Sequence, residues 1–356
     1  MGHKFQNIRK ILVIKLLHIG DVVLTIPVFR ILKENFPDAY VAALVNSGTE
    51  EVLIGNPFID EIIVFDRTIT HMNPLKRLFK ELSFYRSIKK KNFDMTINLT
   101  GGDRGAFVSL LSGAKYRLAY KPQKGFIGKK YFYTHVAEKN GNHALLQNIS
   151  LLDKFGIYSK GIIDTNIYIP EDADLFVKKI FIENKISKED IVIHIHPTSR
   201  WLFKCWKDEY MAEIIKWLIE KKIYIIITSS PDEKEITKTK KILSLIPESY
   251  HSKIINLCGK INIKQLAAIS KASDIFFGVD TAPMHIAAFV GTTVIALFGA
   301  GQYSWKPWGE KHLVISKNVA DRKKMNREDF IQQNINAITP QEVMENFEKV
   351  LKGINK

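Results

Sequence analysis

Short, almost continuously apolar segments alternate with helical patterns along this chain, and the alternation runs through it twice. Such segments are typical of strands whose parallel sheet is covered by helices on both faces. The first series places strands at 11–16, 39–45, 61–66, 94–100 and 116–120, with helices at 21–35, 48–54, 74–91, 104–112 and 142–155. The second places strands at 191–196, 224–229, 254–259, 274–280 and 293–299, with helices at 208–222, 232–246, 262–272 and 282–290.

The two series predict an α/β protein of two Rossmann-like, doubly wound domains that face one another across a cleft. A turn-rich segment, 156–170, separates the series, so we place the first domain at 1–165 and the second at 166–335. Residues 336–356 are expected to form a C-terminal helix, begun by Thr339 and Pro340, that packs back toward the first domain. Ligands of such sheets bind at the carboxyl ends of strands, and the turns there hold the candidate site.

The charge of the chain favours an anionic partner. Lysine and arginine exceed aspartate and glutamate by 52 − 37 = 15, which suits a phosphorylated sugar, an acidic membrane or a nucleic acid.

The two cysteines, Cys205 and Cys258, form neither a CxxC pair nor a zinc-like cluster, so we expect no disulfide and a reducing cytoplasm. The apolar run 11–17 is too short to span a membrane.

Several enzyme classes are disfavoured by missing motifs. The sequence contains no GxxxxGK[ST], HExxH or GxSxG string, which argues against a P-loop NTPase, a zinc protease of that type and an α/β-hydrolase. A nicotinamide fingerprint is poorly supported, because the first strand is followed by a single glycine, Gly20. The one acidic pair of DxD type, Asp172 and Asp174, begins a helix and is interpreted as capping, so no metal is predicted.

The first candidate residue is Asp21, which follows the first strand at a helix start. Gly20 before it allows the backbone to approach a ligand, and this glycine is assigned to acceptor binding. The carboxylate of Asp21 is either a helix cap or a general base that takes a proton from an acceptor hydroxyl.

Three kinds of hydrogen-bond donor follow the strand at 191–196. They are the hydroxyls of Thr198 and Ser199, the guanidinium of Arg200 and the ammonium of Lys204. Such a loop suits a pyrophosphate, with the hydroxyls donating hydrogen bonds and Lys204 offsetting charge on a leaving group. Each residue taken alone is equally consistent with a solvated or capping side chain.

A third group lies where the strand at 274–280 turns into a helix. Asp280 has the chemistry to accept bonds from sugar hydroxyls, and the backbone N–H groups at Thr281 and Ala282 suit a phosphate. His285, one turn on, is a weaker donor-site candidate, because a lone histidine there is more often structural. After the strand at 224–229, Glu233 is a candidate for binding ribose hydroxyls or simply favours the helix dipole.

A basic and aromatic stretch at 115–135 contains no acidic residue. Its lysines include four candidates for acceptor binding, Lys121, Lys124, Lys129 and Lys130. They are interpreted either as solvated residues or as a surface for an acidic acceptor or an anionic bilayer, and single-stranded nucleic acid would suit the same pattern.

Four strings together resemble glycosyltransferase family 9, the lipopolysaccharide heptosyltransferases, and most closely its heptosyltransferase III branch. They are GDVVLTIP (20–27), HPTSRWLFKCW (196–206), GVDTAPMHIAA (278–288) and ALFGAGQYSWKPW (296–308). The resemblance implies a GT-B fold, with the acceptor on the N-terminal domain, the nucleotide sugar on the C-terminal one and no metal or other cofactor. It assigns Asp21 as the base and Lys204 to the donor phosphates. The remaining donor contacts fall on Thr198, Ser199, Glu233, Asp280, Thr281 and His285.

The implied reaction is transfer of heptose from ADP-heptose to a heptose of the lipopolysaccharide inner core on lipid A, with inversion. The resemblance further implies a cytoplasmic protein, which we expect to be a monomer in peripheral contact with the anionic inner membrane and not to bind nucleic acid. Another nucleotide sugar or acceptor glycan remains an alternative. Two alternatives rank below the transferase. One is a nicotinamide-dependent enzyme, and the other is a nucleic-acid-binding protein that would use the 115–135 surface.

Overall fold

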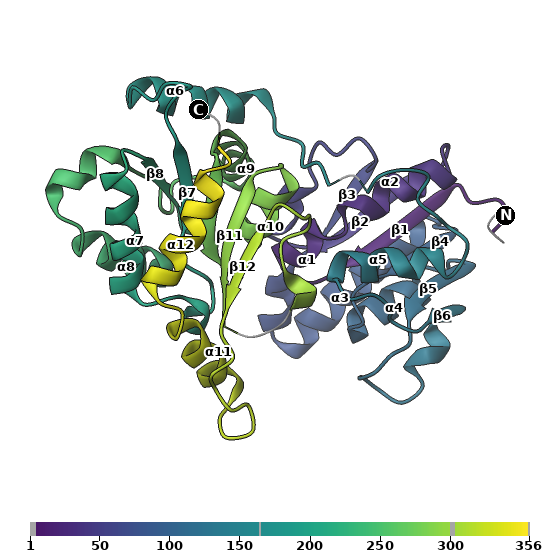
Figure 1. Ribbon diagram of the computed structural model, residues 1–356. Helices are drawn as coiled ribbons and strands as arrows, with labels where there is room; N and C mark the ends of the chain where they lie inside the picture. Colours follow the sequence, from purple (N-terminus) through teal and green to yellow (C-terminus); the bar gives the residue numbers. More distant parts are fainter. Residues whose placement is uncertain (1–4, 164, 300–302, 355–356) are drawn as a thin grey trace. The chain divides into compact units, whose positions relative to one another are not determined.

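The chain forms two compact units, Met1–Tyr168 and Ile169–Lys356, in the computed structural model (Figure 1). The structure describes residues 5–163, 165–299 and 303–354. The division lies three residues after the end of the first domain that the sequence predicts at 165.

The first unit is built on a parallel sheet whose strands are ordered β3-β2-β1-β4-β5-β6. The strands are β1 (Lys10–Lys15), β2 (Tyr40–Asn46), β3 (Glu61–Phe65), β4 (Met95–Asn98), β5 (Tyr116–Tyr120) and β6 (His135–Ala137). The helices are α1 (Ile19–Val23), α2 (Ile26–Asn35), α3 (Pro74–Lys90), α4 (Asp103–Leu111) and α5 (Ala144–Asp153), with short 3₁₀ turns η1 (Glu50–Val52), η2 (Arg67–His71) and η3 (Lys129–Phe132).

The second unit repeats this plan with the order β12-β11-β10-β7-β8-β9. Its strands are β7 (Val192–His196), β8 (Tyr224–Ile227), β9 (Ile254–Asn256), β10 (Ile275–Val279), β11 (Thr293–Phe298) and β12 (Leu313–Ser316). The helices are α6 (Glu171–Glu183), α7 (Asp208–Glu220), α8 (Glu233–Ser244), α9 (Ile263–Ala272), α10 (Ala282–Phe289), α11 (Arg327–Asn336) and α12 (Pro340–Leu351). Three 3₁₀ turns complete it, η4 (Leu202–Lys204), η5 (Glu248–Lys253) and η6 (Tyr303–Trp305).

Both sheets have the same topology. When the strands of each unit are numbered along the chain, each order is 3-2-1-4-5-6, the order of dinucleotide-binding domains. The prediction of two Rossmann-like domains is therefore confirmed. The order reverses between β1 and β4 in one unit and between β7 and β10 in the other, and the loops after these strands are where such sheets bind ligands.

The central strands lie in the core because they are apolar on both faces. Ile11, Leu12 and Ile14 of β1 and Ile193 and Ile195 of β7 are fully buried. A parallel strand covered by helices on each side has no solvated face, which explains why the apolar segments of the sequence do not alternate.

Two predicted helices differ from the structure. The helix predicted at 21–35 is divided into α1 and α2, because Pro27 in the first turn of α2 lacks the N–H that a continuous helix would need. The Thr25 hydroxyl donates to the Val22 carbonyl at 2.6 Å and closes the end of α1. The helix predicted near 48–54 is only the 3₁₀ turn η1.

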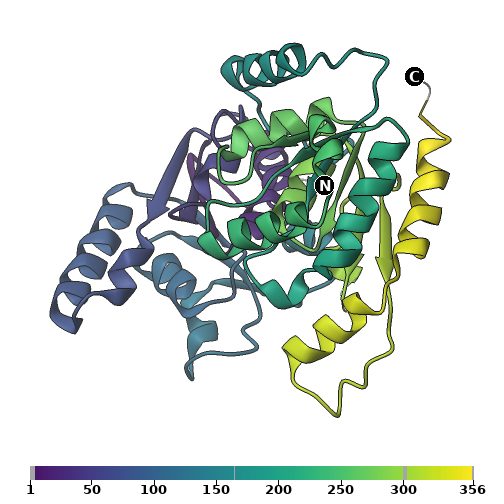
Figure 2. The same cartoon turned by 90° about the vertical axis from the view of Figure 1, so that its left-hand side faces the viewer.

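The C-terminal helix α12, in the segment 336–356 that is predicted to pack back toward the first domain, packs on the core of the second unit. Val343 and Phe347 of α12 are fully buried in the core of the second unit, and the Phe347 ring lies 5.1 Å from that of Phe277 in β10. The apolar stripe of α12 packs against α7, as the yellow and green helices of Figure 2 show. The stripe is thus covered within its own unit.

Candidate functional site

Lys204 and Asp280 form an ion pair at the switch point of the second sheet. Lys204 ends η4, which follows β7, and Asp280 is the residue directly after β10. The Lys204 Nζ lies 2.6 Å from Asp280 Oδ2, and both side chains are largely buried. The two residues come from different predicted motifs, and adjacency of β7 and β10 brings them together.

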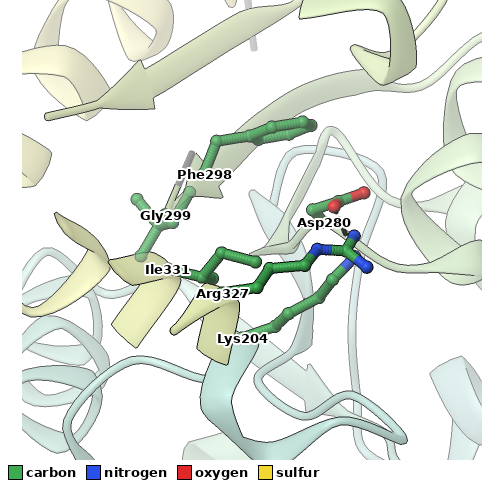
Figure 3. A pocket seen from close by; sticks show the side chains of 7 residues that line it. Lys204, Asp280, Phe298, Gly299, Arg327 and Ile331 are labelled. Carbon is green, nitrogen blue, oxygen red and sulfur yellow. Dashed lines mark hydrogen bonds and ion pairs between the residues drawn. The ribbon is translucent and has the colours of Figure 1, made fainter. Parts of the chain in front are cut away.

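A pocket surrounds this ion pair (Figure 3). Its other lining residues come from the end of β11 and from α11 and are Leu297, Phe298, Gly299, Arg327 and Ile331. Gly299 is required here, because a Cβ at this position would lie 2.2 Å from the carbonyl oxygen of Ile331. The missing side chain lets α11 approach the strand end and form one wall of the pocket.

Arg327 is a site residue that the sequence analysis missed. It begins α11, and Figure 3 shows its guanidinium directed toward Asp280 and the amine of Lys204. Its side chain makes no hydrogen bond or ion pair with any residue that the structure describes. The sequence gives little sign of this residue, because α11 contains few apolar residues and its helix was not predicted from the hydrophobic pattern. An arginine at a helix start is nevertheless unfavourable for the helix dipole and points to another role.

The hydroxyls of Thr198 and Ser199, which the sequence analysis predicts as phosphate donors, are buried and make hydrogen bonds within the protein. Thr198 is fully buried and its Oγ1 donates to Glu235 Oε2 at 2.7 Å. Ser199 is 2% exposed, and its Oγ accepts the Trp201 N–H at 3.4 Å. Both hydroxyls shape the loop that leads to Lys204. Arg200, which lies between Ser199 and η4 in this loop, is exposed.

Glu235 is a second residue that the sequence analysis missed. It is 4% exposed and accepts hydrogen bonds from Thr198 and from Ser230, the latter at 2.6 Å. The predicted residue Glu233 is exposed at the start of α8. Which of Glu233 and Glu235 faces the loop depends on how α8 is rotated about its axis, and the spacing of residues in the sequence does not determine that rotation.

Two buried histidines lie beneath this loop and share one hydroxyl. The Thr228 Oγ1 lies 2.7 Å from His194 Nε2 and 2.9 Å from His196 Nδ1. Burial lowers the pKa of His194 well below its ordinary value, and burial also lowers the pKa of His196, which the nearby Glu235 partly opposes. Both rings are therefore neutral in the folded protein at neutral pH.

We expect the free energy of unfolding to decrease as the pH falls below about 6.5, the ordinary histidine pKa. In that range the unfolded chain binds protons at His194 and His196 that the folded chain does not bind, which favours unfolding. Urea denaturation at pH 7.5, 6 and 5 measures this slope. The variant His196→Gln cannot take up the proton and should show a shallower slope than the wild type. Equal slopes in the two proteins would contradict the assignment.

The start of α10 is placed as the sequence predicts. Thr281 occupies the N-cap position without a capping hydrogen bond from its side chain, and Ala282 is the first residue of the helix; both are partly exposed. His285 differs, because it is 3% exposed within the helix. This burial fits the structural alternative that the sequence analysis kept open for His285.

In the first unit, Gly20 and Asp21 lie in α1 at the end of β1, beside the switch point of that sheet. The Asp21 Oδ2 accepts the backbone N–H of His18 at 3.3 Å, so the carboxylate caps the helix. Asp21 is also partly exposed, so the cap does not bury the residue. The capping and base interpretations are compatible.

A buried lysine, Lys15, interacts electrostatically with Asp21. Lys15 ends β1, is 6% exposed, and donates to the Leu99 carbonyl and to Asn148 Oδ1, each at 3.2 Å. Burial lowers its pKa to about 8, and attraction by Asp21 opposes that shift. A lysine inside an apolar strand was visible in the sequence, and the structure shows that its charge interacts with Asp21.

The four lysines predicted to bind the acceptor have different environments. Lys121, Lys124 and Lys130 are exposed, and Lys121 pairs with Glu138 at 2.8 Å. Lys129 is buried, and its Nζ bonds the Gly101 carbonyl at 2.5 Å and Asp103 at 2.9 Å. Its ammonium thus fixes the loop after β4, whereas the other three lysines are open to solvent.

Within 5–163, 165–299 and 303–354, no group of three or more His, Cys, Asp or Glu is arranged to hold a metal ion. In the same ranges, no helix combines the length and apolarity needed to cross a bilayer. Of the motif at 296–308, residues 300–302 lie outside the described part of the chain.

Comparison with known proteins identifies close similarities over most of the chain. Residues 81–334 match the sequence model of glycosyltransferase family 9 (heptosyltransferase). Lipopolysaccharide heptosyltransferase 3 of Escherichia coli K12 is 30% identical over 340 residues, which cover 93% of this chain and 95% of that protein. The family resemblance that the four strings predict is therefore confirmed.

Two solved structures have the same fold. A glycosyl transferase family 9 protein from Veillonella parvula superposes with a TM-score of 0.80 at 19% identity, covering 97% of this chain and 98% of that chain. The ADP-heptose lps heptosyltransferase II of Escherichia coli superposes with a TM-score of 0.76 at 20% identity, covering 97% and 99%. These similarities confirm the predicted GT-B class.

Proposed function

The chain belongs to glycosyltransferase family 9, the heptosyltransferases, and we propose that it transfers heptose from ADP-heptose to a heptose of the lipopolysaccharide inner core on lipid A. The donor is a nucleotide sugar. The choice of ADP-heptose is supported by the name of the Escherichia coli heptosyltransferase II. The choice of acceptor is supported by the relative that is a lipopolysaccharide heptosyltransferase 3.

The observation that carries the proposal is the cationic pocket at the switch point of the second sheet. Lys204 and Arg327 both reach it, and Asp280 holds Lys204 in place. A nucleoside diphosphate carries its charge on the pyrophosphate, and paired basic side chains in a partly buried pocket bind such a group strongly. We assign the second unit to the donor and the first unit to the acceptor.

The proposed reaction is a single displacement with inversion at the anomeric carbon. Asp21 accepts the proton of the acceptor hydroxyl, whose oxygen forms the new bond to the anomeric carbon. The bond from that carbon to the ADP oxygen breaks, and the electron pair leaves with ADP. Lys204 and Arg327 stabilise the charge on the departing phosphate, together with the backbone N–H groups at the start of α10.

The remaining parts of the proposal concern cofactor and setting. We propose that no metal takes part and that the protein is a cytoplasmic monomer. Because lipid A is anchored in a bilayer, we also propose peripheral contact with the anionic inner membrane, with the exposed Lys121, Lys124 and Lys130 near the acceptor.

Thermal denaturation with ADP, UDP, GDP and NADH tests the donor. We expect ADP alone to raise the melting temperature, since a ligand that binds only the folded state stabilises it by mass action. Turnover of ADP-heptose on a detergent-solubilised core acceptor should then persist in excess EDTA. Preferential stabilisation by UDP or GDP would indicate a UDP-sugar or GDP-sugar donor in place of ADP-heptose. Stabilisation by NADH would favour an oxidoreductase. Activity lost in EDTA and restored by Mg²⁺ would contradict the metal-free mechanism.

A further inference from the structure

The helix α3 carries an apolar stripe on the side that its own unit leaves uncovered. Leu75, Leu78, Phe79 and Leu82 are 72%, 54%, 70% and 40% exposed, respectively. Their spacing of three and four residues places them on one face of the helix. Soluble proteins rarely expose several large apolar side chains side by side, and such patches mark interaction sites.

The opposite face of α3 already has its partners. Ile88 is fully buried, and the Phe84 ring lies 5.1 Å from that of Phe65 in β3, with Tyr85 packed beside them. These contacts anchor the helix to the first unit and fix its rotation. The stripe of four therefore points away from the core, and Figure 2 shows α3 as the blue helix at the rim of this unit.

Basic residues surround the stripe. The helix contains six basic side chains, Lys76, Arg77, Lys80, Arg86, Lys89 and Lys90. Its one acidic residue is Glu81, which pairs with Arg77 at 3.1 Å and with Arg104 at 3.4 Å. Along the outer face the apolar side chains occupy the first half, while Arg86, Lys89 and Lys90 follow in the second half, and all three are exposed.

We propose that α3 docks the protein on an anionic lipid bilayer, with the four apolar side chains inserted at the headgroup boundary and the basic residues on lipid phosphates. A helix with an apolar stripe, flanking lysines and arginines and no membrane-spanning length has the properties of an interfacial helix. The inference extends the proposed function, because it names the surface by which the enzyme meets a membrane-anchored acceptor.

Charge selects this partner over a second copy of the chain. With a net charge of +15, two copies repel one another, and the helix itself has five more basic than acidic residues. An anionic bilayer attracts the same residues, each basic side chain near the surface adding to the binding. A purely apolar partner would leave the basic half of the face unexplained.

The test is sedimentation of the full-length protein with vesicles of phosphatidylcholine mixed with phosphatidylglycerol, and with phosphatidylcholine alone. The variant replaces all four stripe residues by glutamine, Leu75→Gln, Leu78→Gln, Phe79→Gln and Leu82→Gln, which preserves helix propensity. We expect the wild type to bind the mixed vesicles and the variant to bind about tenfold or more weakly. A second variant, Arg86→Gln with Lys89→Gln and Lys90→Gln, should bind more weakly than the wild type and depend less steeply on salt.

The matched control replaces two exposed apolar residues of α6, Leu175→Gln and Ile182→Gln, in a helix that begins with acidic residues. It should bind vesicles like the wild type, and all variants should melt at the wild-type temperature. Absence of wild-type binding to mixed vesicles, or equal binding by the stripe variant, overturns the proposal. A wild-type dimer in sedimentation equilibrium, with a monomeric stripe variant, would also overturn the proposal, because the face would then bind a second copy of the chain. Turnover on the detergent-solubilised acceptor tests the proposed function separately.

Discussion

The variant Asp21→Asn is expected to lose turnover by about 10²- to 10⁴-fold, the contribution usual for a general base. Asparagine retains an oxygen that can accept the His18 N–H, so α1 should keep its cap. The amide cannot take the acceptor proton, and the barrier of the displacement rises. Steady-state kinetics with saturating donor and acceptor measures the loss as a decrease in kcat.

Donor affinity separates this role from a structural one. ADP binding is assigned to the second unit, so calorimetry should give an ADP dissociation constant for Asp21→Asn close to that of the wild type. The exposed Asp38 of the same unit offers a control, and Asp38→Asn should retain full turnover. A variant Asp21→Asn with near-normal kcat would refute the base assignment, and weakened ADP binding would indicate that the substitution disturbs more than the acceptor side.

Lys204→Ala is expected to reduce kcat/KM by about 10²- to 10³-fold, the range seen when one group that stabilises developing charge is removed. The variant loses the cation that faces the departing phosphate. It also leaves the carboxylate of Asp280, now without its partner at 2.6 Å, in the pocket that receives an anion. Donor binding and the chemical step should therefore both weaken.

The ion pair allows these two effects to be separated. In Lys204→Ala with Asp280→Asn the repelling carboxylate is gone, so ADP affinity should recover in part while kcat stays low.

Arg327→Ala should lower ADP affinity while leaving Asp280 paired. Lys207→Ala is the matched control, because Lys207 is exposed and its Nζ lies over the Tyr210 ring. Wild-type kinetics in Lys204→Ala would remove this residue from the mechanism.

The sequence predicts the scaffold well because the scaffold depends on local patterns. Continuous apolar runs locate the central strands, and the doubly wound order then places the residues after β7 beside those after β10. Lys204 and Asp280 could be assigned to one site for this reason. Strands β6 and β12 were missed because segments of three or four residues carry little pattern.

Side-chain direction was much less predictable. Thr198 and Lys129 have the chemistry of ligand-binding residues, but Glu235 and the loop after β4 use their hydrogen bonds. Arg327 lies over a hundred residues from Lys204 in sequence, and only the packing of α11 against η4 brings it to the pocket. Composition and spacing contain no information on such contacts, since they depend on tertiary packing.

The close fit of Gly299 against Ile331 limits how the length of the chain can vary. Arg327 precedes Ile331 by one helical turn, and the buried Asn334 Oδ1 accepts the N–H groups of Val319 and Ala320 at 2.9 Å. One residue inserted between Arg327 and Ile331 would rotate the guanidinium by about 100° around the helix and away from the pocket. Insertions that preserve activity therefore belong in the loop at 321–326, where added residues leave the rotation of α11 unchanged.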